Sequence, residues 1–198
     1  TAIPVLGAGG FNSGRGLVAA LAYGAAGIAM GTRFLLTKES TVPEHIKAAY
    51  LKATLTDTVV THSIDGAPQR VIRTEVIDRL ERASPLTRLP RALANALGFR
   101  HLTKTSLSDL ITEGLAMRKS HELTWSQLAM AANAPMLTRA SMVEGKLEVG
   151  ILPTGQVVGV IDALPTVAEL LDEIMAEADE TLARLTGDAP AVPLRERA

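Results

Sequence analysis

The chain has 198 residues, of which 47% are hydrophobic and 21% charged, and its formal net charge at pH 7 is −1. This balance predicts a globular protein with a sizeable core and argues against a chain selected to coat nucleic acid or an anionic membrane. The lack of cysteine excludes disulfides and thiolate metal sites. Without a secretory signal pattern or an uninterrupted membrane span, we expect a cytoplasmic protein.

The amino-terminal residues predict a βαβ unit. Two short apolar runs, Ile3–Leu6 and Gly27–Met30, are typical of buried parallel strands. Asn12 or Ser13 is a candidate N-cap for a helix between them, and Gly24 is placed to close that helix. Two strands this close in sequence, joined by a helix, favour a parallel pair.

The next segment mixes helix and hairpin patterns. Pro43 is a good first helical residue, and it predicts a helix to about Thr54. The runs Thr58–Ser63 and Gln69–Arg73 flank an Asp65-Gly66 turn and predict two antiparallel strands. The residues Glu75–Arg82 are expected to be helical.

The middle of the chain is basic and then helical. Arg82–Lys104 contains no acidic residue, which indicates a solvated face or a segment that recognises the phosphates of CoA or NADPH. Helical periodicity resumes over Leu107–Lys119. Thr124 and Gln127 form a capping box for a further helix, which Pro135 is expected to break or kink.

The carboxyl-terminal part predicts a return segment and a long helix. The glycine-marked stretch Gly150–Gly159 leads into an expected strand, Val157–Ile161. Thr166 and Glu169 make a capping box for the last helix, and Gly187 is placed to end it. An apolar stripe on this helix is interpreted as core, and it comprises Val167, Leu170, Leu171, Ile174, Ala178, Leu182 and Leu185.

Two glycine turns carry the functional signal. Gly9-Gly10 and Gly31-Thr32 each follow a predicted strand, and a glycine there lets backbone N–H groups approach a ligand closely. The helix after such a turn adds unpaired N–H groups and the positive end of its dipole. Two turns on adjacent strands therefore predict a phosphate site, as in the last two βα loops of a TIM barrel. The alternative is that the glycines only permit tight turns.

The same residues resemble a known family. The stretch "IPVLGAGGF…GRGLVAALAYGAAGIAMGTRFLLTKES" is similar to the nitronate monooxygenase (2-nitropropane dioxygenase) family of FMN-dependent TIM-barrel enzymes, which includes flavin-type enoyl-acyl-carrier-protein reductases. The likeness continues weakly at "TDTVVT", "RVIRT" and "TGQVVGVI". Residues from roughly 83 to 148 resemble instead a subgroup that reduces double bonds of CoA thioesters in steroid ring breakdown.

The resemblance implies a fold and a site. The fold would be α/β, the carboxyl-terminal part of a TIM (β/α)8 barrel with an appended, mostly helical region. The FMN phosphate would be lined by Gly9, Gly10, Met30, Gly31 and Thr32. The family's catalytic histidine is expected on an earlier strand, so we expect the amino-terminal half of the barrel as part of the same chain or as a separate one. A homodimer is a further expectation.

This interpretation divides the chain into four parts. Residues 1–56 would form the last two βα units, and residues 57–150 the appended helical region with its basic segment. Residues 151–187 would be the return segment and final helix, and residues 188–198 a disordered tail.

Three functions stay open. The first is an FMN-dependent oxidoreductase of the nitronate monooxygenase type, acting on a small-molecule substrate. The second is a flavin double-bond reductase that uses NAD(P)H and acts on enoyl thioesters of CoA or acyl carrier protein. The third is a non-catalytic phosphate-binding scaffold. NAD(P)H is expected as a co-substrate only for the double-bond reductase.

Four histidines are candidate bases, and none is chosen. His45 is expected on an exposed helix face, His62 near the hairpin turn, and His101 and His121 beside the basic and helical segments. No pair of them has metal-ligand spacing, so no metal site is predicted.

Three further residues could contribute to the site beside the two turns. Arg33 either pairs with Glu39 or faces the phosphate. Gly155 and Gln156 are candidate active-site residues, since glycine permits close approach and glutamine both donates and accepts hydrogen bonds. The alternative for this pair is a simple turn.

Overall fold

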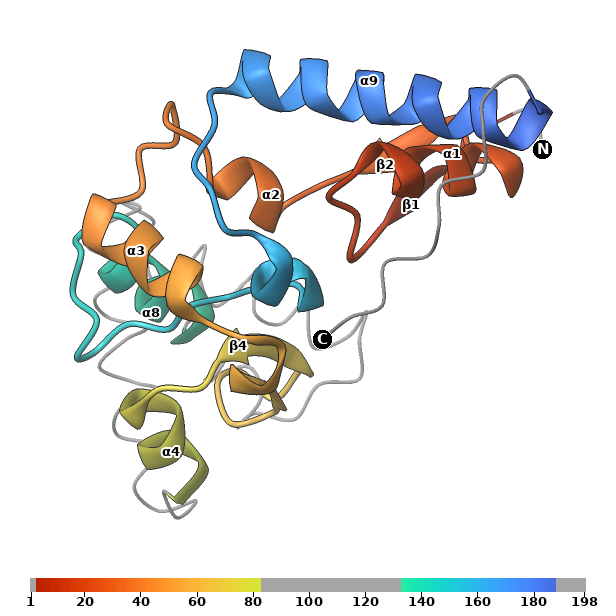
Figure 1. The fold of residues 1–198 in the computed structure, drawn as a ribbon. Coiled ribbons are helices and arrows are strands. Elements are labelled where there is room, and N and C mark those ends of the chain that lie inside the picture. The colour runs from red at the N-terminus through yellow and green to blue at the C-terminus, as the bar shows by residue number, and fades with distance from the viewer. Residues whose placement is uncertain (1–2, 83–132, 188–198) are drawn as a thin grey trace. The chain divides into compact units, whose positions relative to one another are not determined.

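The computed structural model describes residues 3–82 and 133–187. The basic segment after residue 82, both predicted helices between residues 107 and 130, and the expected tail lie outside the described residues. The chain divides into two compact units (Figure 1). Unit 1 combines Thr1–Ser40 with Gly155–Ala198, and unit 2 is Thr41–Thr154. The predicted four-part boundaries stay a prediction.

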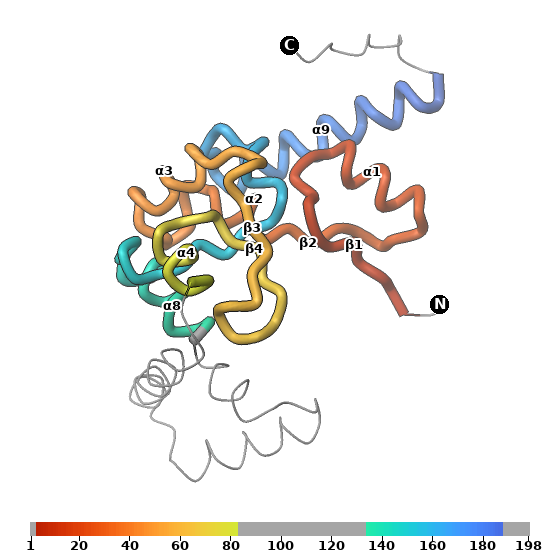
Figure 2. Tube along the Cα trace, turned by 90° about the horizontal axis from the view of Figure 1, so that it is seen from below, coloured from red at the N-terminus to blue at the C-terminus, as the bar shows by residue number. Residues whose placement is uncertain are grey.

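Unit 1 begins with the predicted βαβ unit. Strand β1 (Leu6–Ala8) and strand β2 (Gly27–Ala29) are joined by helix α1 (Gly14–Ala22). The two strands pair in parallel and run side by side in Figure 2. The predicted connection is confirmed, but β1 begins at Leu6 instead of Ile3. The ladder extends only as far as β2 offers partners, and Leu6 pairs with the first residue of that strand, Gly27.

Both ends of α1 are encoded locally. Ser13 is the N-cap, and its hydroxyl accepts a hydrogen bond from the Gly16 amide at 3.3 Å. At the other end Gly24 has φ +88°, a left-handed conformation that glycine adopts without a steric penalty. The Gly24 amide bonds Leu21 O and the Ala25 amide bonds Ala20 O, which is the Schellman arrangement. Both predicted caps are confirmed.

The return segment differs from its prediction. It forms a 3-10 helix, η2 (Gln156–Val160), where a strand over Val157–Ile161 was expected. The neighbouring side chains Val157 and Val158 are both buried. A strand points successive side chains to opposite faces, whereas a helical turn can place two neighbours against one core. The burial of both valines is therefore better satisfied by the 3-10 helix than by the strand that their β-propensity predicted.

Helix α9 (Val167–Thr186) opens and closes as predicted. Thr166 and Glu169 form the capping box, and Gly187 is the left-handed C-cap at φ +85°. The helix packs on α1 through Gly14, where a side-chain methyl group would lie 2.3 Å from Ile174 O. Only a glycine allows the two backbones to come this close.

The apolar stripe of α9 is only partly core. Leu170, Ile174 and Ala178 are buried, as predicted. Leu171, Leu182 and Leu185 are exposed, so the prediction that the whole stripe is core is wrong for these three. The α1 contact covers one side of the stripe and leaves the adjacent side open.

Unit 2 contains the predicted hairpin among helices. Strands β3 (Thr58–Thr61) and β4 (Gln69–Ile72) pair antiparallel, as expected. Before them lie helix α3 (Glu44–Lys52) and the short η1 (Leu55–Asp57), and after them helix α4 (Glu75–Arg82).

Helix α8 (Asn133–Met142) contains the proline that was expected to break or kink a helix. The residues before Asn133 lie outside the described residues, so the expected break or kink at Pro135 stays a prediction.

Unit 2 encloses an apolar cluster of its own. Six buried side chains from the hairpin, α4 and the segment before Leu152 pack together, namely Ile64, Val71, Val76, Ile77, Leu80 and Ile151. The edge of β4 is extended by a bridge between Val71 and Pro153 and by the Ile72 amide, which bonds Leu152 O. Tyr50 is fully buried, and its hydroxyl donates to Pro153 O at 2.7 Å.

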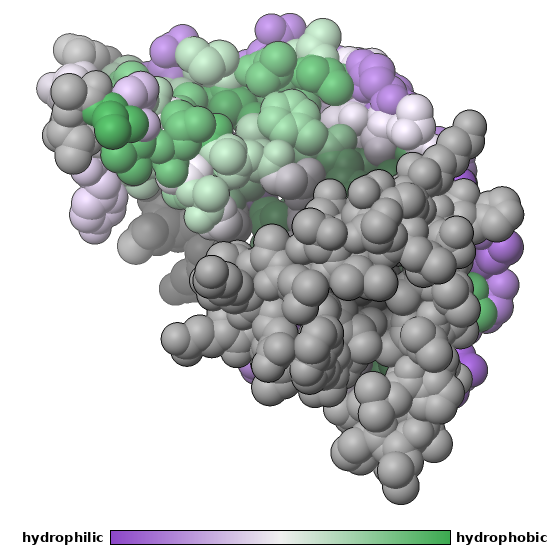
Figure 3. All heavy atoms as spheres, turned by 180° about the vertical axis from the view of Figure 1, so that it is seen from behind, coloured by the Kyte–Doolittle hydropathy of each residue, from purple (hydrophilic) through white to green (hydrophobic). Residues whose placement is uncertain are grey.

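The strands of unit 1 are less covered. Ile3, Val5 and Leu6 are exposed, as are Leu21 and Tyr23 at the end of α1. Figure 3 shows apolar residues gathered over the part of unit 1 that carries β1, β2 and α1. This apolar face is the main difference between the two units.

Candidate functional site

The parallel register brings the two glycine turns to one edge. Ala8 pairs with Ala29, and these are the last residues of β1 and β2. The Gly9-Gly10 turn follows the first strand directly, and Met30 and Gly31 follow the second. Adjacent strands lie about 4.8 Å apart, so backbone groups of both turns can reach one small anion. The residues predicted to line a phosphate therefore share one edge of the sheet.

Conformation and space at the turns suit a ligand. Gly9 and Gly10 have φ values of +102° and +76°, which L side chains rarely adopt. A Cβ built on Gly9, Gly10 or Gly31 meets no atom of the described residues within 4 Å. Gly31 differs from the other two because its φ is −96° and it is the N-cap of helix α2 (Thr32–Leu35). Backbone strain therefore does not require a glycine at position 31.

Thr32 links the second turn to the return segment. The side chain is buried, and its hydroxyl oxygen accepts a hydrogen bond from the Gly155 amide at 2.9 Å. The hydroxyl proton stays available for donation. Gln156 follows directly as the exposed first residue of η2. The structure thus brings Gly155 and Gln156 beside Thr32, although 123 positions separate Thr32 from Gly155 in the sequence.

The amino-terminal end of α1 is occupied from within the protein. The Gly14 amide donates to Glu177 Oε2 at 2.7 Å, and Arg15 pairs with the other carboxylate oxygen at 2.8 Å. The Gly16 amide is taken by Ser13. The expectation that this helix offers its free amides to a phosphate is therefore wrong for Gly14 and Gly16. The proposed phosphate site therefore depends on the amides of the two turns and not on those of Gly14 and Gly16.

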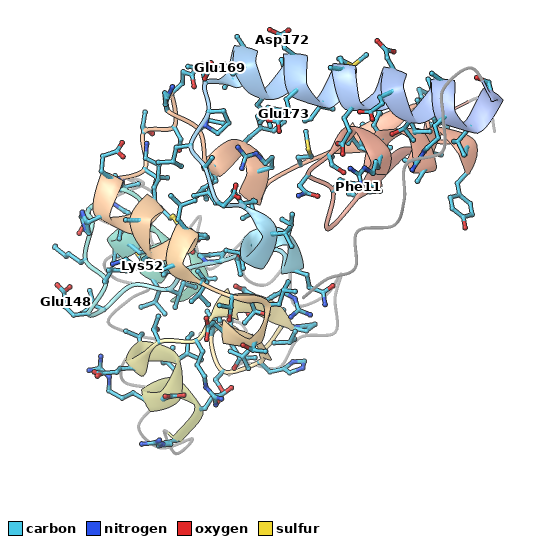
Figure 4. The ribbon with its side chains drawn as sticks, viewed as in Figure 1. Phe11, Lys52, Glu148, Glu169, Asp172 and Glu173 are labelled. Atoms are coloured by element: carbon cyan, nitrogen blue, oxygen red, sulfur yellow. The ribbon has the colours of Figure 1, made fainter. Side chains whose placement is uncertain are left out.

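Phe11 and Glu177 are site-supporting residues that sequence reasoning missed. A Cβ on Gly7 or Gly16 would lie 3.1 or 3.0 Å from the Phe11 ring, so both glycines make room for this side chain. Phe11 lies between the first turn and α1 (Figure 4). The glycines at 7 and 16, together with a bulky residue at 11, were the available signal. Glu177 gave no local signal, because its partner, the Gly14 amide, is 163 positions away.

Arg33 does not pair with Glu39. Its guanidinium is buried, and both terminal nitrogens donate to Ala163 O at 3.4 Å. Both Glu39 oxygens accept instead from the Val167 amide, at 2.9 and 3.0 Å. The predicted pair is thus wrong, because the free amides at the beginning of α9 attract the carboxylate more directly. The Lys38 amide also bonds Pro165 O in this region.

Burial dominates the electrostatics of Arg33. Desolvation lowers the pKa of its guanidinium, while the negative charges of Glu173 and Asp162 act in the opposite direction. The Nε atom is buried without a hydrogen-bond partner among the described residues.

The two described histidines lie on exposed positions of unit 2. His45 contacts Gly145 O at 2.7 Å through Nε2, which matches its expected surface position. His62 contacts Gly66 O at 3.3 Å through Nδ1. His101 and His121 lie outside the described residues. Within residues 3–82 and 133–187, no group of three His, Asp or Glu side chains could hold a metal ion.

No helix in the described part of the chain is long and apolar enough to cross a membrane.

Comparisons with known proteins agree with the motif. The family model "Nitronate monooxygenase" matches residues 1–177. The chain is 53% identical over 178 residues to a 5-hydroxy-7a-methyl-1-oxo-octahydro-1H-indene-4-carboxyl-CoA dehydrogenase of Mycobacterium tuberculosis, covering 90% of this chain and 50% of that protein. It is 47% identical over 78 residues to a probable nitronate monooxygenase of Staphylococcus saprophyticus, covering 39% of this chain and 22% of the relative.

A solved structure supports the predicted fold class. FabK from Thermotoga maritima superimposes with a TM-score of 0.61 at 31% identity, covering 94% of this chain and 48% of that one. The fold is α/β and corresponds to part of a TIM barrel, as predicted. The chain spans about half the length of the curated relatives with which it shares 53% identity.

Proposed function

The chain belongs to the nitronate monooxygenase family, and from this premise we propose that it forms the phosphate-binding part of an FMN-dependent oxidoreductase. One observation carries the proposal. Two glycine turns leave the same edge of a parallel strand pair, with open space where side chains would stand. A phosphate needs several converging N–H donors and a close approach to the backbone, and this arrangement supplies both.

The proposed cofactor residues are those of the two turns. The amides of Gly9 and Gly10 would bind the FMN phosphate from one strand, and those of Met30, Gly31 and Thr32 from the next. The buried Thr32 hydroxyl would donate a further hydrogen bond, because its oxygen already accepts from the Gly155 amide. The family also fits, since flavin phosphates in TIM barrels bind at the last two βα loops.

The bound flavin would supply the hydride chemistry of the reaction. The residues of this chain would hold its phosphate and keep Gly155 and Gln156 beside Thr32, where they would line the active site. We do not assign a catalytic base to this chain. The family's histidine is proposed to lie in the amino-terminal half of the barrel, in the same or a separate chain.

The exposed apolar surface of unit 1 supports the proposal that further barrel strands accompany it. The free edge of β1 and the side chains of Val5 and Leu6 are exposed in the described structure. An uncovered parallel strand edge is unfavourable, because its backbone groups lack sheet partners. We propose that further barrel strands cover it. Homodimer formation and a cytoplasmic location are parts of the same proposal that rest on the family and the composition.

The substrate class proposed first is an acyl-CoA. The relatives that cover 90% and 89% of the chain are both named as dehydrogenases of a bicyclic carboxyl-CoA. That likeness extends through the middle of the chain, whereas the likeness to the probable nitronate monooxygenase of Staphylococcus saprophyticus covers only 78 residues. The reaction would be a two-electron oxidation of a CoA thioester or the reverse reduction of an enoyl thioester, for which NAD(P)H would be the reductant. The likeness to FabK supports the reductase direction.

A nitronate monooxygenase is the second candidate. Its support is the family match and the 47% identity to a probable nitronate monooxygenase over 78 residues. A non-catalytic phosphate-binding scaffold is the third, and it predicts that the protein carries no flavin.

The first test is the visible spectrum of the full-length protein under anaerobic conditions. A flavin band is expected, and its absence would contradict the proposal. Bleaching by a saturated acyl-CoA indicates a dehydrogenase. Bleaching by NADH or NADPH, with recovery on adding an enoyl-CoA, indicates a reductase. Bleaching by a nitronate alone indicates a nitronate monooxygenase.

A matched pair of glycine variants tests the site. Gly10→Val and Gly24→Val both place a side chain at a positive φ in open space, so their backbone strain is comparable. Only Gly10 belongs to the proposed site. We expect Gly10→Val to weaken FMN binding at least about tenfold, and Gly24→Val to leave the affinity unchanged. Equal losses in both variants would contradict the assignment.

A further inference from the structure

Arg33 is a buried charged residue of unit 1 that has few close polar partners among the described residues. Arg33 is only 6% exposed, and its Nε atom has no hydrogen-bond partner among the described residues. The terminal nitrogens share a single carbonyl, Ala163 O, at 3.4 Å, near the upper limit of a hydrogen bond. No carboxylate oxygen of residues 3–82 or 133–187 is within ion-pair distance of the guanidinium.

Such an arrangement is poorly suited to stabilising the fold. A buried charge without a close counter-ion loses its hydration, and an apolar residue of similar size often stabilises the same position better. The two negative charges that act on Arg33, Glu173 and Asp162, act without direct ion pairs. In Figure 4, Glu173 lies on the side of α9 toward α2, whereas Asp172 lies on the opposite side. The position therefore calls for an explanation other than stability.

The location of Arg33 suggests a role in holding the return segment. It follows Thr32 directly, and these two residues hold the two ends of one segment. Thr32 Oγ1 accepts from the amide of Gly155, at the beginning of the segment. Arg33 donates to the carbonyl of Ala163, at its end. The 3-10 helix η2 lies between these two attachment points.

We propose that Arg33 is a positioning residue for the flavin site, which holds the segment Gly155–Ala163 on α2 so that Gly155 and Gln156 stay beside Thr32. A planar guanidinium suits this task because its two terminal N–H groups fix the orientation of one carbonyl, which a lysine ammonium does not. The inference rests on the proposed function for its link to flavin, but the attachment itself can be measured without flavin.

The experiment compares Arg33→Met, Arg33→Lys and the control Arg184→Met in the full-length protein. Arg184 is an exposed arginine in the last turn of α9. Hydrogen exchange of residues 155–163 is measured in flavin-free protein, FMN affinity by fluorescence titration, and global stability by urea unfolding. For Arg33→Met we expect exchange about tenfold faster in this segment and FMN binding about tenfold weaker, with the urea midpoint unchanged or raised.

Each alternative has its own signature. A purely structural role lowers the urea midpoint in parallel with FMN affinity. A role of the positive charge alone lets Arg33→Lys restore FMN affinity, whereas the proposed role leaves Arg33→Lys close to Arg33→Met. Unchanged exchange in residues 155–163 overturns the attachment. If the wild-type protein binds no FMN, the proposed function fails, while the exchange comparison still decides whether Arg33 holds the segment.

Discussion

Unit 1 and unit 2 bury their apolar side chains in different ways. Unit 2 surrounds its hairpin with an apolar cluster in which Val71, Ile77 and Ile151 are completely buried. Unit 1 leaves its strand pair largely uncovered, and Leu6 in β1 is 59% exposed. Its main internal contact is the close crossing of α1 and α9 at Gly14.

Unit 1 carries the proposed cofactor site, whereas unit 2 carries the apolar cluster around the hairpin. The family motif lies in unit 1, where glycines leave open space at the strand ends. The apolar cluster that surrounds the hairpin lies in unit 2. Large apolar residues fill cores, whereas glycines keep backbone groups accessible, so one stretch of chain cannot do both at the same positions. Three predictions test this contrast.

The largest effect is expected in the unit 2 cluster. Ile77→Ala removes a completely buried side chain and should lower the free energy of unfolding by about 3 kcal/mol, measured by urea denaturation. The control is Val60→Ala in β3 of the same unit, whose side chain is 47% exposed and whose loss should cost under about 1 kcal/mol. Equal costs for the two variants would contradict the enclosed core of unit 2.

In unit 1 the sensitive position should be a glycine. Gly14→Ala would place a methyl group 2.3 Å from Ile174 O and 2.4 Å from Ala178 N, forcing α1 away from α9. We expect a loss of about 2 kcal/mol in the free energy of unfolding, measured by urea denaturation. Gly16→Ala is the matched control in the same helix, because its nearest neighbour is the movable Phe11 ring at 3.0 Å. A nearly neutral Gly14→Ala would mean that the crossing is looser than described.

The smallest effect is expected from pH at the beginning of α9. The hydrogen bond from the Thr166 backbone lowers the pKa of Glu169, with further contributions from the Thr166 side chain and from Lys38. Because the folded-state pKa is depressed, this carboxylate stabilises the fold above its unfolded pKa of about 4.3, and the contribution is lost as the pH falls through the folded-state value. Glu169→Gln should therefore lose less stability than wild type on acidification.

The measurement for Glu169 is the urea midpoint at neutral pH and near pH 3. The difference between wild type and Glu169→Gln should shrink on going to the lower pH. Glu180→Gln, at an exposed position on the same helix, serves as the control for the removal of one carboxylate charge. A difference for Glu169→Gln that does not vary with pH would contradict the prediction.

Much of the fold was predictable because its signals are local. The hairpin β3–β4 is marked by two strand-like runs on either side of Asp65-Gly66, and α9 by its capping box and Gly187. Caps and turns depend on residues within a few positions of one another, so they survive in almost any tertiary context. The strand expected at residues 157–161 failed for the opposite reason. Strand formation depends on a partner, and packing selected η2 instead.

The features of the candidate site likewise fall into two groups, those encoded in short stretches of sequence and those made only by the tertiary structure. The sequence by itself determined where the glycine turns lie, how α1 and α9 are capped, and which family the motif resembles, because all three reside in short contiguous stretches. Only the tertiary structure decided that Glu177 occupies the beginning of α1 and that Thr32 holds Gly155. These contacts join residues more than 120 positions apart, 163 and 123 respectively. A hydrogen bond of that kind depends on where the fold brings its donor and acceptor together, and no local pattern encodes that position.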